Sequence, residues 1–393
     1  MDPTSAKDAA RQRVEGTLDG LIELSHAIHA NPELGYEEHR ASVWVAELLE
    51  KSGFAVSRGV GGMETALVGT YGAGPLNVAL LIEYDALPEV GHACGHNVIA
   101  ASSVGAGLGL AAVAEELGMR VTVIGTPAEE GGAGKQLLLD AGAFEGVHCA
   151  LMVHPGPNDQ LLPEVLAAQS IDITYTGLPS HAGAFPERGI NAGDAIVVAQ
   201  VAIGLLRQAL MPTDRVHGIV AVGGEAPNII PARTEGRWMI RAASVARMDE
   251  LREKVMRCFE AGATASGASL AVNAHTVYAD MIHDPDLTRL YRANAEQLGR
   301  TFVDDLPPDP TRLLMTRFST DMGNVSYAVP AIHPIIGIDS TPAVNHQPEF
   351  TAAAASPAAD KAVLDGAIAL AWTAIDAAGD EAVRTRLLSQ SPA

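Results

Sequence analysis

The spacing of apolar and polar residues divides the first part of the chain into alternating helices and short buried strands. Residues 10–30 carry apolar side chains at helical spacing, which predicts one amphipathic helix ending before Pro32. A run of apolar residues at 77–82 predicts a buried central strand. The same patterns predict helices over 41–51, 98–114 and 135–141 and strands over 54–60, 65–70, 121–125 and 150–153. Strands that alternate with helices are typical of an α/β sheet whose functional edge lies at the carboxyl ends of the strands.

The pattern changes near residue 168. From there the order is strand, helix, strand, strand, helix, strand, over 170–177, 190–210, 216–222, 234–243, 248–266 and 270–278. This order is that of a split, ferredoxin-like α+β domain. We therefore expect an inserted domain at 169–280, within a first domain formed by 1–168 and 281–393. The first domain resumes with a helix at 285–298, a proline-rich surface connection at 306–310, a strand at 332–338 and a helix at 351–377.

Composition and charge argue against several classes of protein. The 393 residues, 48% hydrophobic and 19% charged, suffice for two domains with cores of their own. The net charge of −21 argues against a nucleic-acid partner, which needs clustered Lys and Arg. Three scattered cysteines do not form a disulfide framework. Because neither a secretory signal nor an uninterrupted apolar run of about 18 residues is visible, we expect a soluble cytoplasmic protein without a membrane partner.

Candidate metal ligands follow the predicted strands. Cys94 and His96 lie between the strand at 77–82 and the next helix, and thiolate with imidazole suits zinc. Taken alone, this pair is more typical of an inert buried thiol beside a structural histidine. His92 adds an imidazole that could equally serve packing or hydrogen bonding.

Two adjacent carboxylates strengthen the case for a metal centre. Glu129 and Glu130 come directly after the strand at 121–125 and its short turn. Since neighbouring side chains diverge, one can bind a metal while the other acts as general base on the metal-bound water. An ordinary acidic loop is the alternative, and the buried strand before the pair makes it less favoured.

Two further histidines are candidate ligands only because the residues described above also follow predicted strands. His154 follows the strand at 150–153, and His346 lies near the last predicted strand. The candidate ligands are then one more than a closed tetrahedral zinc site takes: Cys94, His96, Glu130, His154 and His346. Five ligands with one shared between two ions fit a pair of metals about 3.5–4 Å apart, as in co-catalytic hydrolases.

Together these residues resemble the M20 family of metallopeptidases, and more narrowly its amidohydrolase branch. The resemblance covers nearly the whole chain through the motifs His29-Ala30-Asn31-Pro32-Glu33-Leu34-Gly35-Tyr36-Glu37-Glu38, Asp85-Ala86-Leu87-Pro88, Gly91-His92-Ala93-Cys94-Gly95-His96, Pro127-Ala128-Glu129-Glu130, Ser180-His181-Ala182-Gly183 and His346-Gln347-Pro348-Glu349-Phe350. One departure is Asn97 after His96, where many members have Asp. Together with Glu83-Tyr84-Asp85-Ala86-Leu87-Pro88-Glu89 and with Ser319-Thr320-Asp321 before Gly323-Asn324, it points toward a subgroup similar to dipeptidases and aminobenzoyl-glutamate hydrolases.

The resemblance implies a role for each residue of the centre. Cys94 would bridge two divalent ions, zinc or manganese, with His96 and His154 on one ion and Glu130 and His346 on the other. Glu129 would be the general base and acid, and Asp85 would support the ligands.

The resemblance also implies roles for residues outside the ligand set. The inserted domain would serve as lid and dimerisation module of a homodimer. His181 would stabilise the oxyanion, in relatives at the partner subunit's site, and Asn228 and Arg241 would lie near the substrate. Asp321, which could also be an ordinary turn residue, is expected in the pocket.

These expectations define an α/β metallohydrolase that cleaves the amide of an N-acyl amino acid or a small dipeptide-like substrate. The attacking group would be a metal-bridging hydroxide, with Glu129 as its general base. One alternative is a deaminase, in which the same hydroxide displaces an amine from an aromatic or amidine carbon. A second alternative is a non-catalytic protein that binds a metal or ligand, although simple binding would not need a spare carboxylate at Glu129.

Overall fold

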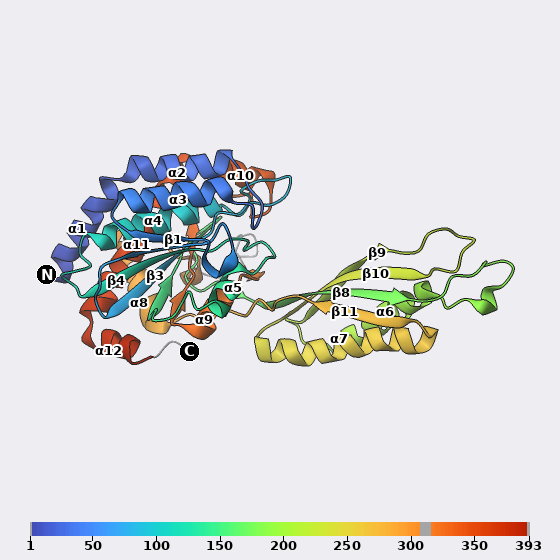
Figure 1. The fold of residues 1–393 in the computed structure, drawn as a ribbon. Coiled ribbons are helices and arrows are strands. Elements are labelled where there is room, and N and C mark those ends of the chain that lie inside the picture. The colour runs from blue at the N-terminus through green and yellow to red at the C-terminus, as the bar shows by residue number, and fades with distance from the viewer. Residues whose placement is uncertain (1, 307–315, 391–393) are drawn as a thin grey trace. The chain divides into compact units, whose positions relative to one another are not determined.

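The chain folds into two compact units in a computed structural model that describes residues 2–306 and 316–390 (Figure 1). Unit 1 combines 1–164 with 281–393, and unit 2 is formed by 165–280. The first boundary precedes the expected one by four residues because strand β8 (Ala167–Thr176) already begins at Ala167. Residues 307–310 of the proline-rich stretch lie outside the described residues.

Unit 1 contains a six-stranded sheet with the strand order β1-β2-β4-β3-β5-β13. Its strands β3, β4, β5 and β13 run parallel to one another, and β1 and β2 form an antiparallel extension. The bounds are β1 (Ala55–Arg58), β2 (Leu67–Tyr71), β3 (Leu76–Ile82), β4 (Met119–Gly125), β5 (Cys149–Leu151) and β13 (Ala331–Ile332). The carboxyl ends of β3, β4 and β5 therefore meet at one edge, where ligands bind in open α/β sheets.

Alternate residues of the central strand β3 face opposite layers of helices, as the two-residue period of a strand requires. Val78 and Leu80 belong to the core that α4 (His96–Ala111) and α11 (Pro357–Gly379) share with the N-terminal helices. Ala79 and Leu81 belong to a second core under α5 (Gly134–Asp140) and α9 (Met322–Ala328). Both faces are buried, which explains why β3 is a continuous apolar run.

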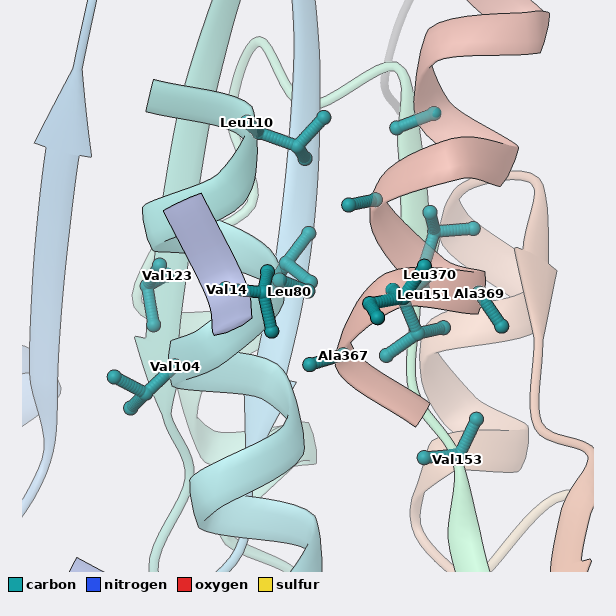
Figure 2. Packing of buried hydrophobic residues seen from close by; sticks show 14 of the residues in the cluster. Val14, Leu80, Val104, Leu110, Val123, Leu151, Val153, Ala367, Ala369 and Leu370 are labelled. Atoms are coloured by element: carbon teal, nitrogen blue, oxygen red, sulfur yellow. The ribbon is translucent and has the colours of Figure 1, made fainter. Parts of the chain in front are cut away.

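Helices α4 and α11 pack closely against each other because their contact faces consist of small residues. Figure 2 shows Leu110 on the side of α4 that faces α11 and Ala367 of α11 pointing back toward α4, whereas Val104 points to the other side, near Val123. At Gly105, a Cβ atom would lie 2.8 Å from Leu21 Cδ1 and 2.9 Å from Ala367 Cβ. Glycine at this position is what allows α4 to approach both neighbouring helices.

Proline and glycine divide three elements that the sequence predicted as single. The expected helix at 10–30 is two helices, α1 (Pro3–Glu15) and α2 (Leu18–Ala30), separated at Gly16. The expected helix at 351–377 is α10 (Pro348–Ala353) and α11, which begins at Pro357 after the capping Ser356. The expected strand at 332–338 is β13 and β14 (Ile335–Gly337), with Pro334 between them.

Helices α3 (His39–Lys51) and α8 (Pro285–Gln297) lie close to the positions that the sequence predicts. The elements that the sequence did not predict are β6 (His154–Gly156), β7 (Glu164–Val165), β12 (Thr316–Phe318) and α12 (Glu381–Ser389). Strand β6 pairs in parallel with β14, which places His154 beside the C-terminal part of the chain.

Unit 2 has the ferredoxin-like order that the sequence predicts. Its antiparallel sheet has the strand order β11-β8-β10-β9, and two helices share a core with it. The elements after β8 are α6 (Ala192–Leu206), β9 (Arg215–Val222), β10 (Arg233–Ala242), α7 (Val245–Ser266) and β11 (Ser269–Ala274).

Two helical segments are long and apolar enough, by composition alone, to pass as membrane spans. The segment Pro357–Gly379 is 83% buried within the protein, as a core helix is. The segment Ala192–Ala209 is 28% buried, because α6 contacts its own sheet on one side only.

Candidate metal centre

The loop between β3 and α4 brings a thiol and an imidazole to the functional edge of the sheet. Gly95 lies between them in a left-handed conformation (φ 73°), and a Cβ atom there would lie 2.6 Å from Pro155 Cγ. The glycine thus lets Cys94 and His96 approach the segment that carries His154.

The predicted ligands form two groups that share one atom. The Sγ of Cys94 and one ring nitrogen each of His96 and His154 lie within 4.8 Å of one another, and all three residues are buried. Cys94 also forms a group of the same size with Glu130 and His346. The structure therefore brings all five predicted ligands together, with Cys94 common to both groups.

The second group is the more open one. His346 Nε2 lies 3.7 Å from Glu130 Oε1, and the His346 side chain is 60% exposed. Its backbone has a left-handed φ of 71°, and its N–H donates to the carbonyl of Ala93, which ties it to the Cys94 loop.

Asp85 connects the two sides of the centre. Its Oδ1 lies 3.0 Å from His96 Nδ1, and its Oδ2 accepts a hydrogen bond from the backbone N–H of Glu130 at 2.9 Å. A proton on Nδ1 of His96 leaves Nε2 free to bind a cation. Asp85 thus orients one ligand through its ring and another through its backbone.

Residues of the N-terminal motif hold the carboxylate loop in place. Glu38 is buried and accepts from the backbone N–H of Ala128 at 2.8 Å and from the hydroxyl of Thr65 at 2.7 Å. Tyr36 donates to the carbonyl of Gly132 at 2.5 Å. The loop that contains Glu129 and Glu130 is therefore anchored on both sides.

Burial and neighbouring charges shift the acid–base groups of the centre. Burial raises the pKa of Glu129 well above its usual range, and Glu83 and Glu130 raise it further. Burial and the charge of Glu130 likewise raise the pKa of the Cys94 thiol. Although burial opposes it, Asp85 and Glu83 raise the pKa of His96 well above its ordinary value. Bound cations would displace the protons that these shifts retain.

A buried ion-pair network, which the sequence did not reveal, adjoins the ligands. The Nζ of Lys135 lies 2.6 Å from Glu83 Oε1 and 2.6 Å from Asp321 Oδ1, and all three side chains are fully buried. Although burial opposes it, Lys135 lowers the pKa of Glu83. In the sequence, Glu83 was marked by its place directly after the central strand and by the motif that resembles the dipeptidase-like subgroup, and neither indicated the ion pair.

Asp321 is not placed as expected. It was predicted at the substrate, but its two carboxylate oxygens accept from the ammonium of Lys135 at 2.6 Å and the backbone N–H of Lys135 at 2.9 Å. Its side chain has no exposed surface. This arrangement assigns Asp321 to the packing of the centre instead of to a substrate contact.

The predicted residues of unit 2 lie at opposite ends of its sheet. The backbone of His181 forms a bridge with Ile229, so that His181 and Asn228 are neighbours beyond the carboxyl end of β8. Arg241 pairs with Ala168 at the start of β8, whereas Arg233 pairs with Thr176 at its end. Eight residues of strand separate these ends by about 26 Å. One copy of unit 2 therefore does not bring His181 and Arg241 together.

His181 is prepared to donate a hydrogen bond. Its Nδ1 accepts from the backbone N–H groups of Gly183 and Ala184, each at 3.1 Å, and the residue is exposed. Because Nδ1 acts as an acceptor, the ring proton is on Nε2. This tautomer suits the role of oxyanion donor.

The chemistry of the donors fits two divalent ions. In the part of the chain that the structure describes, His96 Nε2 and Glu130 Oε1 are buried without a hydrogen-bond partner. Thiolate, imidazole and carboxylate are ligands of zinc, and imidazole and carboxylate also suit manganese. His92, the additional imidazole, instead stacks on His29 with ring centroids 6.3 Å apart.

Comparisons with known proteins identify the family of this chain. Residues 79–364 match the peptidase family M20/M25/M40. The chain belongs to this family. It is a hydrolase that acts on amide bonds, as the resemblance implied.

Two curated relatives have different substrates in their names. The chain is 42% identical to the mouse (Mus musculus) Xaa-Arg dipeptidase over 387 residues, which cover 94% of this chain and 88% of the relative. It is 30% identical to one of the subunits of the p-aminobenzoyl-glutamate hydrolase of Escherichia coli over 275 residues, or 64% of this chain and 56% of the relative.

A solved structure shares the fold. The chain is similar to a dinuclear metal-binding peptidase of the M20 family from Bacillus subtilis, with a TM-score of 0.67, 21% identity and coverage of 90% of this chain and 98% of the other.

Proposed function

We propose that this hydrolase cleaves the amide bond of a dipeptide or N-acyl amino acid at a centre of two divalent ions. Cys94 would bridge the ions, His96 and His154 would hold one, and Glu130 and His346 the other. The observation that carries this proposal is that Cys94 belongs to two ligand groups that otherwise share no residue. Zinc is the ion that a bridging thiolate favours, and manganese is the alternative.

Glu129 would move the proton during hydrolysis. Two bound cations would polarise the scissile carbonyl and acidify the attacking water. Glu129 Oε2 lies 3.9 Å from His96 Nε2, and this carboxylate would take a proton from the attacking water and pass it to the leaving nitrogen. Its burial suits this role, since a group that holds a proton between two steps needs a raised pKa. His181 would donate to the developing oxyanion.

Replacement of Glu129 by glutamine tests its role as the general base. Glu129→Gln should keep both ions and lose turnover by about 10²–10⁴-fold, the usual contribution of a general base. Glu64→Gln is the matched control, because the Glu64 side chain is 83% exposed. Retention of kcat in Glu129→Gln would reject the assignment of the base.

The substrate we favour is a dipeptide with a basic C-terminal residue. The support is the 42% identity to the Xaa-Arg dipeptidase across nearly the whole chain, against 30% over a shorter stretch to the aminobenzoyl-glutamate enzyme. Assays with Xaa-Arg and Xaa-Lys dipeptides, aminobenzoyl-glutamate and acetylated amino acids would rank these substrates by kcat/KM. Release of ammonia without a free amino acid would instead indicate deamination.

We also propose that unit 2 forms a homodimer. On α6, Val197, Val201 and Leu205 recur every four residues and are 55%, 59% and 75% exposed. At the edge of the sheet, Ile219 and Val220 of β9 are 61% and 40% exposed, and β9 pairs on one side only among the described strands. An apolar stripe and an unpaired strand edge together favour a second copy as occupant.

A dimer would also give His181 a function, because His181 lies at the end of unit 2 that is remote from both connections to unit 1. We expect it to serve the centre of the partner subunit. Leu205→Glu should yield monomers in sedimentation velocity, whereas Val43→Glu, at a 39% exposed site on α3, should not. A Leu205→Glu protein that stays dimeric would contradict this surface, and binding of the wild type to lipid vesicles would assign it to a membrane.

A further inference from the structure

A carboxylate oxygen outside the predicted ligand set points at the metal centre. Glu83 is the first residue after β3 and is fully buried. Its Oε2 lies 3.3 Å from His96 Nε2, the ring nitrogen that is free to bind a cation. Glu83, His96 and Glu129 form a third group of potential ligands within 4.8 Å, which shares His96 with the group of Cys94 and His154.

Three other buried carboxylates around the centre have their oxygens occupied by protein donors. Asp85 contacts His96 and the N–H of Glu130, Glu38 contacts Thr65 and the N–H of Ala128, and Asp321 contacts Lys135 twice. Within the described ranges, the buried carboxylate oxygens without a hydrogen-bond partner are Glu83 Oε2 and Glu130 Oε1. Glu130 is already a candidate ligand. An unpartnered buried oxygen is costly, and a cation is the partner that would remove the cost.

Lys135 determines the direction in which this oxygen points. Its ammonium binds Glu83 Oε1 at 2.6 Å, so the opposite oxygen of the same carboxylate is turned toward His96. Lys135 is itself held by Asp321 through both its ammonium and its backbone N–H. The orientation of Glu83 is therefore built into the fold.

The separation of the two atoms matches a shared cation. Two ligand atoms that each lie about 2.1 Å from a tetrahedral zinc ion are about 3.4 Å apart. The distance from His96 Nε2 to Glu83 Oε2 is 3.3 Å. A proton on Nε2 can serve this oxygen while no cation is bound, and the cation would then take the place of that proton.

We propose that Glu83, oriented by Lys135, is a further ligand of the cation held by Cys94, His96 and His154. This inference rests on the proposed metal centre and adds a residue to it. The two ions would then differ in coordination, because the first would have four protein ligands in a buried site. The second, with the 60% exposed His346, keeps the open position that a substrate needs.

Metal binding to the stripped protein tests the proposal without relying on turnover. Wild type, Glu83→Gln and Asp214→Asn are titrated with Zn²⁺ against a chromophoric chelator, and the spectrum of the Co²⁺-loaded proteins is recorded. Asp214 of unit 2 is the matched control because its side chain is also fully buried, but both its oxygens have protein donors, Met211 and Arg247.

The expected result is selective weakening of the tighter ion. In Glu83→Gln its affinity should fall tenfold or more, since loss of even an outer partner of a ligand costs about 10–100-fold. The visible bands of Co²⁺ should change with the coordination number, whereas Asp214→Asn, which contacts none of the candidate ligands, should leave both the affinity and the spectrum unchanged. If Glu83→Gln fails to fold, Glu83→Asp keeps the charge for Lys135 but is one methylene too short to reach the cation.

Failure of this inference is distinguishable from failure of the proposed function. Wild type that binds two ions and hydrolyses its substrate, with unchanged affinity and spectrum in both Glu83 variants, would overturn the ligand assignment alone. Equal losses in Glu83→Gln and Asp214→Asn would overturn it as well. Wild type that binds no pair of ions would overturn the proposed centre itself.

Discussion

Lys135 offers a direct measure of how much the buried network contributes to stability. In Lys135→Met the two carboxylates of Glu83 and Asp321 lose the ammonium that lies 2.6 Å from each of them. Removal of one partner of a buried ion pair costs about 3–5 kcal/mol, because it leaves an uncompensated charge. We expect a loss of about 4 kcal/mol, as Asp321 keeps its bond to the backbone N–H of residue 135 while Glu83 loses the ammonium that binds its Oε1. In a unit of this size such a loss lowers the melting temperature by about 8–16 °C.

The assay is urea unfolding of metal-stripped protein, so that bound ions do not add to the stability of the folded state. Lys51→Met is the control, since Lys51 is 74% exposed and its pair with Glu47 should change stability by less than about 0.5 kcal/mol. A loss below about 1 kcal/mol in Lys135→Met would refute the reasoning. An equal loss of stability in Lys51→Met would refute it as well.

The pH dependence of this loss gives a second check with a defined sign. Lys135 lowers the pKa of Glu83 in the folded protein, so its contribution is present above the unfolded pKa of a glutamate. The contribution disappears as the pH falls through the lowered folded pKa. The difference in unfolding free energy between wild type and Lys135→Met should therefore shrink on acidification.

Three further predictions concern the metals and the packing. Because the pKa values of Cys94 and His96 are both raised, binding of the ions near neutral pH should release about two protons. Calorimetry in buffers of different ionisation enthalpy measures this release, and its absence would contradict the raised pKa values. Cys94→Ala should lose both ions and His346→Ala only one, counted by elemental analysis after dialysis; equal losses would argue against a bridging thiolate. Gly105→Ala should destabilise the protein by about 1–2 kcal/mol because the new Cβ atom meets Leu21 and Ala367. Gly20→Ala, with open space around it in α2, should instead stabilise the protein by about 0.5–1 kcal/mol. A change of the same sign in both variants would refute the close packing of α4.

The gathering of the candidate ligands was predictable because most of them follow a strand with a clear apolar pattern. Cys94, Glu130 and His154 lie just beyond β3, β4 and β5, and parallel strands end at one edge. The spacing of apolar residues along the chain also predicted the ferredoxin-like order of strands and helices in unit 2. These features depend on short-range order along the chain, which a single sequence contains.

The network of Lys135 could not be predicted in this way. Its partners Glu83 and Asp321 are 52 and 186 residues away, and a lysine before Gln136-Leu137 is typical of an exposed position in a short helix. Asp321 was misassigned for the same reason, since only tertiary packing shows that its carboxylate faces a buried ammonium. Helix breaks at Gly16 and Pro357 were readable in principle, but the apolar spacing on both sides concealed them.

The way the chain enters and leaves unit 2 has a consequence for how such an enzyme can be rebuilt. Ala168 and Tyr278 exchange two backbone hydrogen bonds, each 2.9 Å long, so the two connections run side by side. A segment of more than a hundred residues is thus joined to its host through a junction no wider than a hairpin. Excision at this junction and closure with a short turn would leave the host strands in register, and a foreign domain with adjacent termini could be grafted there to recognise a different substrate.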